Sequence, residues 1–173
     1  MKKIPASARS YAPKKRNKKD VKYIVIHYTG IVGDRAENNC LFYKNVNTRE
    51  AGAHFFVDQY GSFYKSIDLN RTAYAVGGAK YTDCAKTGGG KYYGMVTNAN
   101  SVSIELCDIV NKEPSEKMIK GVVKVIKYIQ TYCPNATVIV RHFDVNGKHC
   151  PASMMNSEAW TKFQLKLLEQ IMK

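Results

Sequence analysis

Three short apolar runs constrain the fold of this chain more than any other feature. They are VKYIVIHYTG at 21–30, SVSIELCD at 101–108 and TVIVRH at 137–142. Short runs of apolar and β-branched residues are typical of buried strands. Helical patterns lie between and after them, and strands that alternate with helices build α/β sandwiches. The sequence therefore predicts a single α/β domain with a central mixed β-sheet covered by helices on both faces.

The helical patterns are clearest in the second half of the chain. Segment 115–132 repeats apolar residues every three or four positions, at Met118, Ile119, Val122, Ile126 and Ile129. Apolar residues at this spacing form one face of a helix. The C-terminal segment predicts another helix, capped by Asn156, with inward-facing Trp160, Phe163, Leu167 and Ile171.

The segments between the first two strands predict one helix and one hairpin. Residues 34–46 suit a helix with Asp34 as its cap and with Leu41 and Phe42 facing inward. Residues 53–68 contain two β-rich runs around a turn at 58–62, the pattern of a hairpin. Residues 70–100 show little periodicity, so we expect a long surface loop there.

Positive charge is concentrated at the N-terminus. The chain has a formal net charge of +13, and residues 1–20 contain eight basic residues and one acidic residue. We therefore divide the chain into a basic arm at 1–20 and a folded domain at 21–173. Such an arm favours polyanions, among them nucleic acid, anionic lipid and the phosphate-rich polymers of a bacterial envelope. A disordered solubilising tail is the alternative.

The sequence gives little sign of a targeting segment, a membrane span or disulfide bonds. The first residues are basic, but Pro5, Arg9 and Lys14 interrupt any apolar segment, so we expect no classical signal peptide. No apolar run approaches the about 18 residues that a membrane-spanning helix needs, so we expect no membrane insertion. Five cysteines are scattered without a C-x-x-C pair. This odd number predicts buried thiols rather than a disulfide framework.

His27, His142 and Cys150 are the candidate metal ligands. The two histidines end two predicted strands, and the short segment 143–149 allows a loop to bring Cys150 back to them. Histidine and cysteine suit zinc, and a catalytic zinc takes three protein ligands and one water. Three structural residues, or a nucleophilic Cys150 with His142 as its base, remain alternatives. Glu105 projects from the more polar face of its strand.

Four ordered segments carry a resemblance to a known family. YIVIHYTG, AGAHFFVDQYGSFYKSID, NSVSIELC and RHFDVNGKHCP occur in the order found in zinc-dependent N-acetylmuramoyl-L-alanine amidases. That family includes phage lysozyme-like amidases and animal peptidoglycan recognition proteins. The resemblance covers about residues 21–172, so it implies a zinc amidase domain at 21–173, with the fold of the family.

By position, the resemblance implies roles for five residues. His27, His142 and Cys150 become zinc ligands, Lys148 becomes a catalytic basic residue, and Glu105 becomes a catalytic acidic residue. Several relatives have a tyrosine immediately before the hairpin histidine, where this chain has alanine at position 53. This departure favours a mechanism based on Glu105. The remaining histidines, at positions 54 and 149, are expected to be a hydrogen-bonded structural residue and a bystander.

The resemblance also implies the substrate. Peptidoglycan would be cleaved between N-acetylmuramic acid and the first L-alanine of the stem, with Zn²⁺ as cofactor and cell-wall lysis as the outcome. A non-catalytic peptidoglycan-binding module and a Cys-His hydrolase are the alternatives. We expect a monomer without a nucleic-acid partner, made in the cytoplasm and acting on the wall after release or non-classical export. Substrate-binding residues stay unassigned, although Tyr74, Tyr81, Tyr92 and Tyr93 suit a groove wall.

Overall fold

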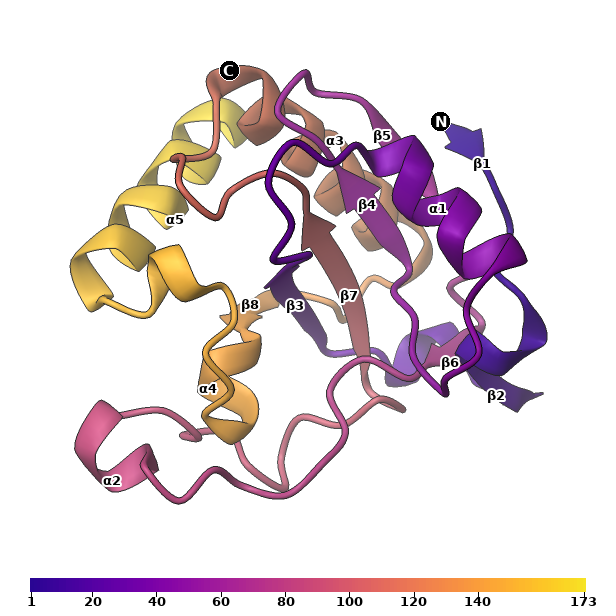
Figure 1. Cartoon of the computed structure of the whole chain (residues 1–173), viewed down its shortest axis with the longest axis horizontal. Coiled ribbons are helices and arrows are strands. Elements are labelled where there is room, and N and C mark those ends of the chain that lie inside the picture. Colours follow the sequence, from indigo (N-terminus) through magenta and orange to yellow (C-terminus); the bar gives the residue numbers. More distant parts are fainter.

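The computed structural model describes all 173 residues, and its centre is a mixed six-stranded sheet (Figure 1). The strands lie in the order β1-β5-β4-β7-β3-β8, and a separate two-stranded sheet joins β2 to β6. The strands are β1 (Lys2–Lys3), β2 (Tyr11–Lys15), β3 (Tyr23–Tyr28), β4 (Phe55–Val57), β5 (Phe63–Lys65), β6 (Arg71–Ala73), β7 (Ser101–Leu106) and β8 (Val138–Arg141).

Five α-helices and three 3₁₀ turns accompany the strands. The α-helices are α1 (Ala36–Asn45), α2 (Cys84–Thr87), α3 (Glu116–Tyr132), α4 (His142–Asn146) and α5 (Ser157–Ile171). The 3₁₀ turns are η1 (Ala8–Ser10), η2 (Lys18–Asp20) and η3 (Ala152–Met154). The predicted α/β domain with a mixed central sheet is therefore confirmed. None of the helices is long and apolar enough to cross a membrane.

The sheet has two faces that differ in chemistry. Strands β3, β7 and β8 are parallel, and β4 pairs with β7 in parallel and with β5 in antiparallel orientation. Because successive side chains alternate, Ile24 and Ile26 of β3 enter the main core. His27 projects from the opposite face, as Glu105 does from β7. The second face therefore carries both His27 and Glu105.

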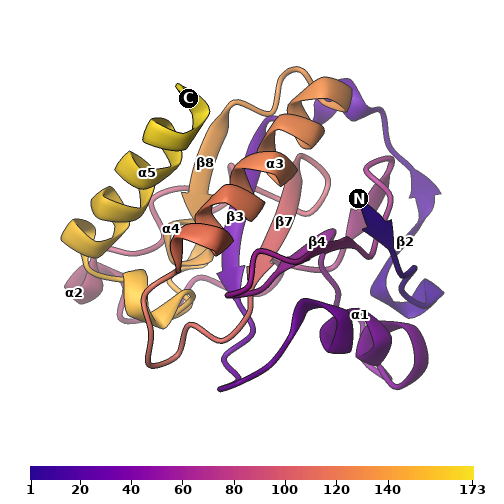
Figure 2. The same cartoon turned by 90° about the horizontal axis from the view of Figure 1, so that it is seen from above.

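Helices α3 and α5 cover the first face, and Figure 2 shows α3 in front of β3 and β7, with α5 beside β8. The apolar stripe predicted for 115–132 is buried as expected, and the Ser115 Oγ accepts a hydrogen bond from Met118 N–H as the helix cap. Such a cap stabilises a helix by about 1 kcal/mol. Trp160, Phe163 and Leu167 of α5 are also buried, whereas Ile171 is 36% exposed and does not contribute as predicted.

Helix α1 covers the second face at β4 and β5. The helix begins after Arg35 rather than at Asp34, and its buried residues are Ala36 and Cys40. The predicted inward residues Leu41 and Phe42 are each 40% exposed, so that expectation is wrong. Small side chains one helical turn apart let α1 lie close to the sheet, which turns the larger residues outward.

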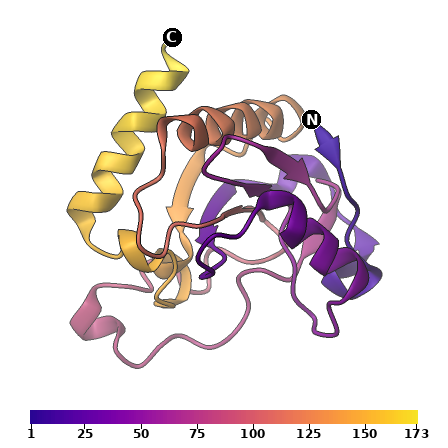
Figure 3. The ribbon, with the colours of Figure 1, turned by 45° about the horizontal axis from the view of Figure 1, so that its top comes forward.

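The long connection between β5 and β7 covers the rest of the second face. It holds the short elements β6 and α2, and its remainder is irregular, largely as the sequence predicted. Figure 3 shows this connection on the side of the sheet opposite α3. Val76 and Val96 pack on Val25 and Val140 of the sheet, so the connection is held by a small core of its own.

The first 20 residues are part of the fold and do not form a disordered tail. Strand β1 pairs with β5, and β2 pairs with β6. The Arg16 guanidinium donates hydrogen bonds to the carbonyl oxygens of residues 69, 98, 99 and 101, at 2.7–3.0 Å. These carbonyls lie at the two ends of the β5–β7 connection. Arg16 therefore ties both ends of that connection to the N-terminal segment.

Candidate functional site

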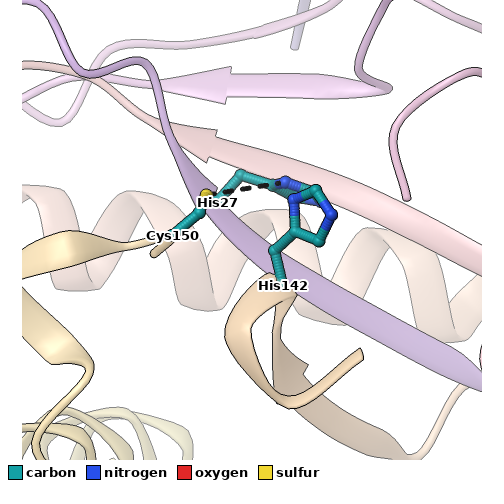
Figure 4. A group of neighbouring side chains, drawn as sticks. All are labelled: His27, His142 and Cys150. Carbon is teal, nitrogen blue, oxygen red and sulfur yellow. Dashed lines mark hydrogen bonds between the residues drawn. The ribbon is translucent and has the colours of Figure 1, made fainter. Parts of the chain in front are cut away.

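His27, His142 and Cys150 meet at the carboxyl ends of β3 and β8. Their ligand atoms all lie within 4.8 Å of one another, and all three side chains are buried. Figure 4 shows them pointing toward a common centre from three different segments of the chain. The Cys150 Sγ lies 3.9 Å from His27 Nδ1, and the imidazole centroids of His27 and His142 are 4.6 Å apart. The sequence therefore correctly predicted that these three side chains lie close together.

A buried ion pair fixes the positions of His142 and Cys150. Arg141 is the last residue of β8, so His142 begins α4 rather than ending the strand as predicted. The Arg141 guanidinium pairs with the Asp144 carboxylate at 2.6 Å and donates to the carbonyl oxygen of Met154. This links α4 to the segment after Cys150. Because one partner alone would be an uncompensated buried charge, the pair holds its geometry tightly.

The loop from α4 to Cys150 turns at a position that requires glycine. Gly147 has φ of 89°, and a Cβ there would collide with the Cys84 Sγ. A residue with a side chain would suffer both backbone strain and that collision. The chain then returns so that the Phe143 N–H donates to the Cys150 carbonyl oxygen at 2.9 Å. This bond sets Cys150 beside the first turn of α4.

The electrostatics of the three side chains suit a cation. Burial lowers the pKa of His27 well below its ordinary value and the pKa of His142 to about 3, so both imidazoles are neutral near pH 7. The Nε2 of His27 and both ring nitrogens of His142 are buried without a hydrogen-bond partner. Neutral imidazole nitrogens with free lone pairs are metal ligands. Burial also raises the pKa of the Cys150 thiol to about 12.

The donor set and its spacing fit zinc. Tetrahedral zinc with bonds of about 2.1 Å to nitrogen and 2.3 Å to sulfur places those two atoms about 3.6 Å apart. The separation of 3.9 Å between His27 Nδ1 and Cys150 Sγ is close to that value. Two imidazoles and one thiolate also leave a fourth position for water or substrate. The three residues therefore can hold a zinc ion with an open coordination position.

Glu105 lies beside this cluster on the next strand. His27 of β3 and Glu105 of β7 are register partners, so their side chains project side by side from the same face. The Glu105 Oε2 is buried and makes no hydrogen bond. Burial raises the pKa of this carboxyl to about 7, although the nearby positive charge of Lys148 opposes the rise. A carboxyl with a pKa near neutrality can both accept and donate a proton at physiological pH.

Lys148 lies on the loop two residues before Cys150. It is exposed, and it lines the same pocket as Glu105, His27 and Cys150. Its positive charge acts on both imidazoles and lowers their pKa values further. Lys148 therefore brings a positive charge to the mouth of the cluster.

The other two histidines lie outside the cluster, as the sequence predicted. His54 is buried, and its Nδ1 accepts a hydrogen bond from the Ser103 N–H at 3.1 Å while its Nε2 lies 3.1 Å from the Arg71 carbonyl oxygen. The Arg16 guanidinium also lies 3.0 Å from His54 Nε2, so hydrogen-bond partners surround the ring on both sides. His149 is largely exposed and contacts Asp83 at the surface, 3.0 Å away.

Two adjoining pockets form a groove across the cluster. One, of about 680 Å³, includes His27, Glu105 and Cys150, and the other, of about 830 Å³, includes His142. Five residues line both of them, namely Glu50, Ala51, Tyr74, Ala75 and Lys148.

Several wall residues were missed from the sequence. Helix α1 and the turn after it supply Asn38, Asn39, Phe42, Tyr43 and Arg49 to the first pocket. No motif marks them, because tertiary packing alone brings α1 onto β4 and β5 at the edge of the groove. Of the four tyrosines suggested for a wall, Tyr74 and Tyr81 line the groove. Tyr92 instead packs its ring edge-on to Tyr23.

Comparison with known proteins gives consistent matches. The Amidase_2 family, described as N-acetylmuramoyl-L-alanine amidase, matches residues 17–153. The N-acetylmuramoyl-L-alanine amidase BlyA of Bacillus subtilis is 31% identical over 155 residues, which cover 83% of this chain and 40% of BlyA. CwlL of Bacillus licheniformis is 29% identical over 157 residues, which cover 85% of this chain and 41% of CwlL. The chain thus spans about two fifths of the length of these relatives.

Solved structures share the fold. The structure of PlyL superposes with a TM-score of 0.71 at 23% identity and covers 96% of each chain. The PlyG catalytic domain gives a TM-score of 0.72 at 23% identity, covering 98% of this chain and 94% of its own. The segment matched by the family model contains His27, Glu105, His142, Lys148 and Cys150. The chain therefore belongs to the N-acetylmuramoyl-L-alanine amidase family.

Proposed function

We propose that this chain is a zinc-dependent hydrolase that cleaves the amide bond between N-acetylmuramic acid and L-alanine in bacterial peptidoglycan. The observation that carries the proposal is the convergence of His27, His142 and Cys150 in an open groove, with Glu105 one strand away. Family membership supports the choice of bond. The relatives BlyA and CwlL bear the name of this activity.

We assign the metal to the three converging side chains. His27, His142 and Cys150 would hold the zinc, with Cys150 binding as a thiolate because a metal displaces the thiol proton. When bound, zinc supplies Lewis acidity that polarises the scissile carbonyl and lowers the pKa of the attacking water to about 7. The buried imidazoles stay neutral, so the protein contributes one negative charge to the site.

Proton transfer falls to Glu105. Its carboxylate accepts a proton from the attacking water and then donates that proton to the nitrogen of the departing L-alanine. The raised pKa, about 7, suits both steps, because a group with a pKa near the working pH is an efficient base and acid. The products are the free carboxyl of the muramic acid lactyl group and the amino terminus of the stem peptide.

Lys148 stabilises the negative charge that develops on the carbonyl oxygen. Its ammonium lies at the mouth of the cluster, in contact with both pockets of the groove. As water adds to the amide, negative charge grows on the carbonyl oxygen, and a cation at this position stabilises it. Tyr43 and Arg49, on the wall beside Glu105, would contact the peptide part of the substrate.

The alternative of a Cys-His hydrolase was predicted with His142 as the base, but the histidine whose ring nitrogen contacts Cys150 Sγ is His27, at 3.9 Å. A nucleophilic cysteine needs a thiolate, which a protonated histidine normally stabilises. Here the pKa of Cys150 is raised to about 12 and those of both histidines are lowered. These shifts oppose a thiolate–imidazolium pair. They support Cys150 as a ligand rather than as the nucleophile.

The deciding experiment is mass spectrometry of fragments released from purified peptidoglycan. The proposal expects stem peptides with a new L-alanine amino terminus and intact glycan strands. Glycan fragments, or peptides cut between amino acids, would refute the choice of bond. Full activity after chelation of the metal would instead support the Cys-His hydrolase, and wall binding without any product would support a binding module.

We further propose an endolysin-type role, in which a monomer made in the cytoplasm acts on the wall after release or non-classical export. An endolysin from Bacillus subtilis is among the solved structures with this fold, with a TM-score of 0.69 at 20% identity. External addition of the protein to living cells and size-exclusion chromatography test these two points. Lysis only after membrane permeabilisation, and elution at the mass of one chain, are the expected results.

A further inference from the structure

The exposed side of α3 carries lysine alone over three helical turns. Between positions 117 and 127 the exposed residues of this helix are Lys117, Lys120, Lys124 and Lys127. Spacings of three and four residues place them on one side of the helix, in a row about 15 Å long. We call these four residues the lysine stripe. The residues between them are buried in the core.

The lysine stripe forms no ion pair, and the one acidic residue of the helix is the exposed Glu116, one turn before Lys120. The chain pairs lysines elsewhere, for example Lys162 and Lys166 with Glu113. Like charges three and four residues apart destabilise a helix by about 0.2–0.5 kcal/mol for each pair. A solvated helix face usually mixes charges of both signs, which relieves this repulsion. The stripe is therefore a self-repelling row of cations that an external polyanion would stabilise.

The C-terminal end of α3 extends the positive surface. The Lys18 ammonium lies over the Tyr132 ring, 5.1 Å from its centroid. Lys65 donates a hydrogen bond to the Tyr128 hydroxyl, 3.3 Å away. These residues line a hollow of about 250 Å³ at the end of the helix. The hollow contains one acidic residue, Asp68, which pairs with Lys65.

The lysine stripe lies on the side of the molecule away from the groove. Helix α3 packs on the face of the sheet that carries Ile26 and Ile104, whereas His27 and Glu105 project from the other face. A polymer bound along α3 therefore leaves the groove open. Binding on one side and hydrolysis on the other are compatible in one molecule.

We propose that the lysine stripe binds a linear polyanion of the bacterial wall, a polymer with regularly repeated phosphodiester groups. The row of ammonium groups is extended and unpaired, which suits a flexible chain of repeated negative charges better than a compact ligand. The choice of a wall polymer rests on the proposed function, since peptidoglycan would bring this chain to such a polymer. The site would hold the enzyme on the wall while its groove engages the stem peptides.

The test uses the full chain and two variants of equal net charge. The stripe variant carries Lys120→Gln, Lys124→Gln and Lys127→Gln, and the control variant carries Lys44→Gln, Lys86→Gln and Lys91→Gln at exposed positions elsewhere. Binding is measured by sedimentation with purified walls, either intact or stripped of phosphodiester polymer by hydrofluoric acid. Hydrolysis of a soluble muropeptide is measured in parallel, because it reports the groove independently of wall binding. Circular dichroism checks that each variant folds.

The stripe variant should bind intact walls at least tenfold more weakly than the control variant, with unchanged hydrolysis of the muropeptide. The slope of log affinity against log salt should fall by about two, since each contact with a flexible polyanion contributes about 0.7. Equal binding by the two variants would overturn the proposal, as would equal binding of wild type to intact and stripped walls. Tighter binding of duplex DNA than of the wall polymer would reassign the stripe to nucleic acid. A wild-type protein that does not hydrolyse the muropeptide would refute the proposed function. The binding result would stand in that case.

Discussion

His27 and Glu105 are register partners on adjacent parallel strands, and their side chains project from the same face of the sheet. This relationship places an unpaired carboxyl directly beside a buried imidazole. Each group has one buried atom without a hydrogen bond, namely His27 Nε2 and Glu105 Oε2. Polar atoms left in this state are costly to a fold, so they point to a site that a ligand completes.

Replacing Glu105 should remove catalysis without removing the fold. We expect Glu105→Gln to lower kcat by about 10²- to 10⁴-fold, because the amide cannot relay the proton. Zinc content and the urea midpoint should stay at wild-type levels, since Gln keeps the shape of the side chain. The matched control is Glu37→Gln, an exposed residue of α1. More than a tenth of wild-type activity in Glu105→Gln would assign the proton relay to another group.

Removing the metal should abolish activity and lower thermal stability together. Zinc that binds only the folded state stabilises it in proportion to the logarithm of zinc concentration over Kd. We expect chelated protein to be inactive, and added Zn²⁺ to restore both activity and Tm. Cys150→Ser should bind zinc far more weakly in equilibrium dialysis, whereas Cys133→Ala, buried at the end of α3, should bind it normally. A Tm that does not respond to Zn²⁺ would contradict the ligand set.

Lys148 should act on the transition state rather than on substrate binding. We expect Lys148→Met to lower kcat by about 10- to 100-fold with little change in KM, because a charge that meets a developing oxyanion matters only as the bond breaks. Lys148→Arg should retain part of the activity. His149→Gln, the next residue, provides the control. A change confined to KM would show that Lys148 binds substrate instead.

The zinc-free protein should lose stability in acid, partly through His54. Burial, and then the charge of Arg16, lower the pKa of His54 to about 3, against about 6.5 in an unfolded chain. Between these values the unfolded state binds one more proton, so stability falls as pH drops from 6.5 toward 3. The contribution is at most about 1.4 kcal/mol for each pH unit. It is fully retained above pH 6.5.

Urea unfolding of zinc-free wild type and His54→Gln at pH 7.5, 6.5 and 5.5 measures this effect. The variant should show a shallower loss of stability with acid than the wild type. His27 and His142 titrate in both proteins, so the difference between the two slopes isolates His54. Parallel slopes would mean that His54 takes up its proton in the folded state at its ordinary pKa.

Arg16 should stabilise the fold although it lies before the segment matched by the family model. Its guanidinium serves four carbonyl groups, and burial lowers its pKa to about 10, so it stays charged. We expect Arg16→Met to lower the free energy of unfolding by about 2–3 kcal/mol, through loss of charged hydrogen bonds. Lys15→Met is the exposed control. Deletion of residues 1–20 should lower the free energy of unfolding further. An unchanged free energy of unfolding would show that residues 1–20 are an arm separate from the folded domain.

The sequence predicted the elements better than their contacts. A continuous apolar run identified β3, period-two alternation identified β7, and helical periodicity identified α3 and α5, because burial of these elements requires such patterns. The predicted inward face of α1 was wrong because small residues, Ala36 and Cys40, contact the sheet there. A pattern of apolar residues does not show which of them are small enough for close packing. The fold of residues 1–20 was missed because their lysines face solvent while the backbone pairs with β5 and β6.

The candidate site was also predicted only in part. His27 and His142 were found because they follow apolar runs, and parallel strands bring their carboxyl ends to one edge of the sheet. The groove wall was not found, since Tyr43 and Arg49 reach it through the packing of α1. The lysine stripe was not predicted from the sequence, and only the structure shows that it lies opposite the groove.

The two pockets of the groove share five wall residues and flank the cluster of candidate ligands, with His142 in one pocket and His27 and Cys150 in the other. A channel that continues past the reacting centre on both sides does not require a chain end to be threaded into it. Under the proposed function, a cross-linked network could therefore be approached sideways, and any stem along a strand could be cut first. Degradation would then proceed at interior points of the mesh rather than from the ends of the glycan strands.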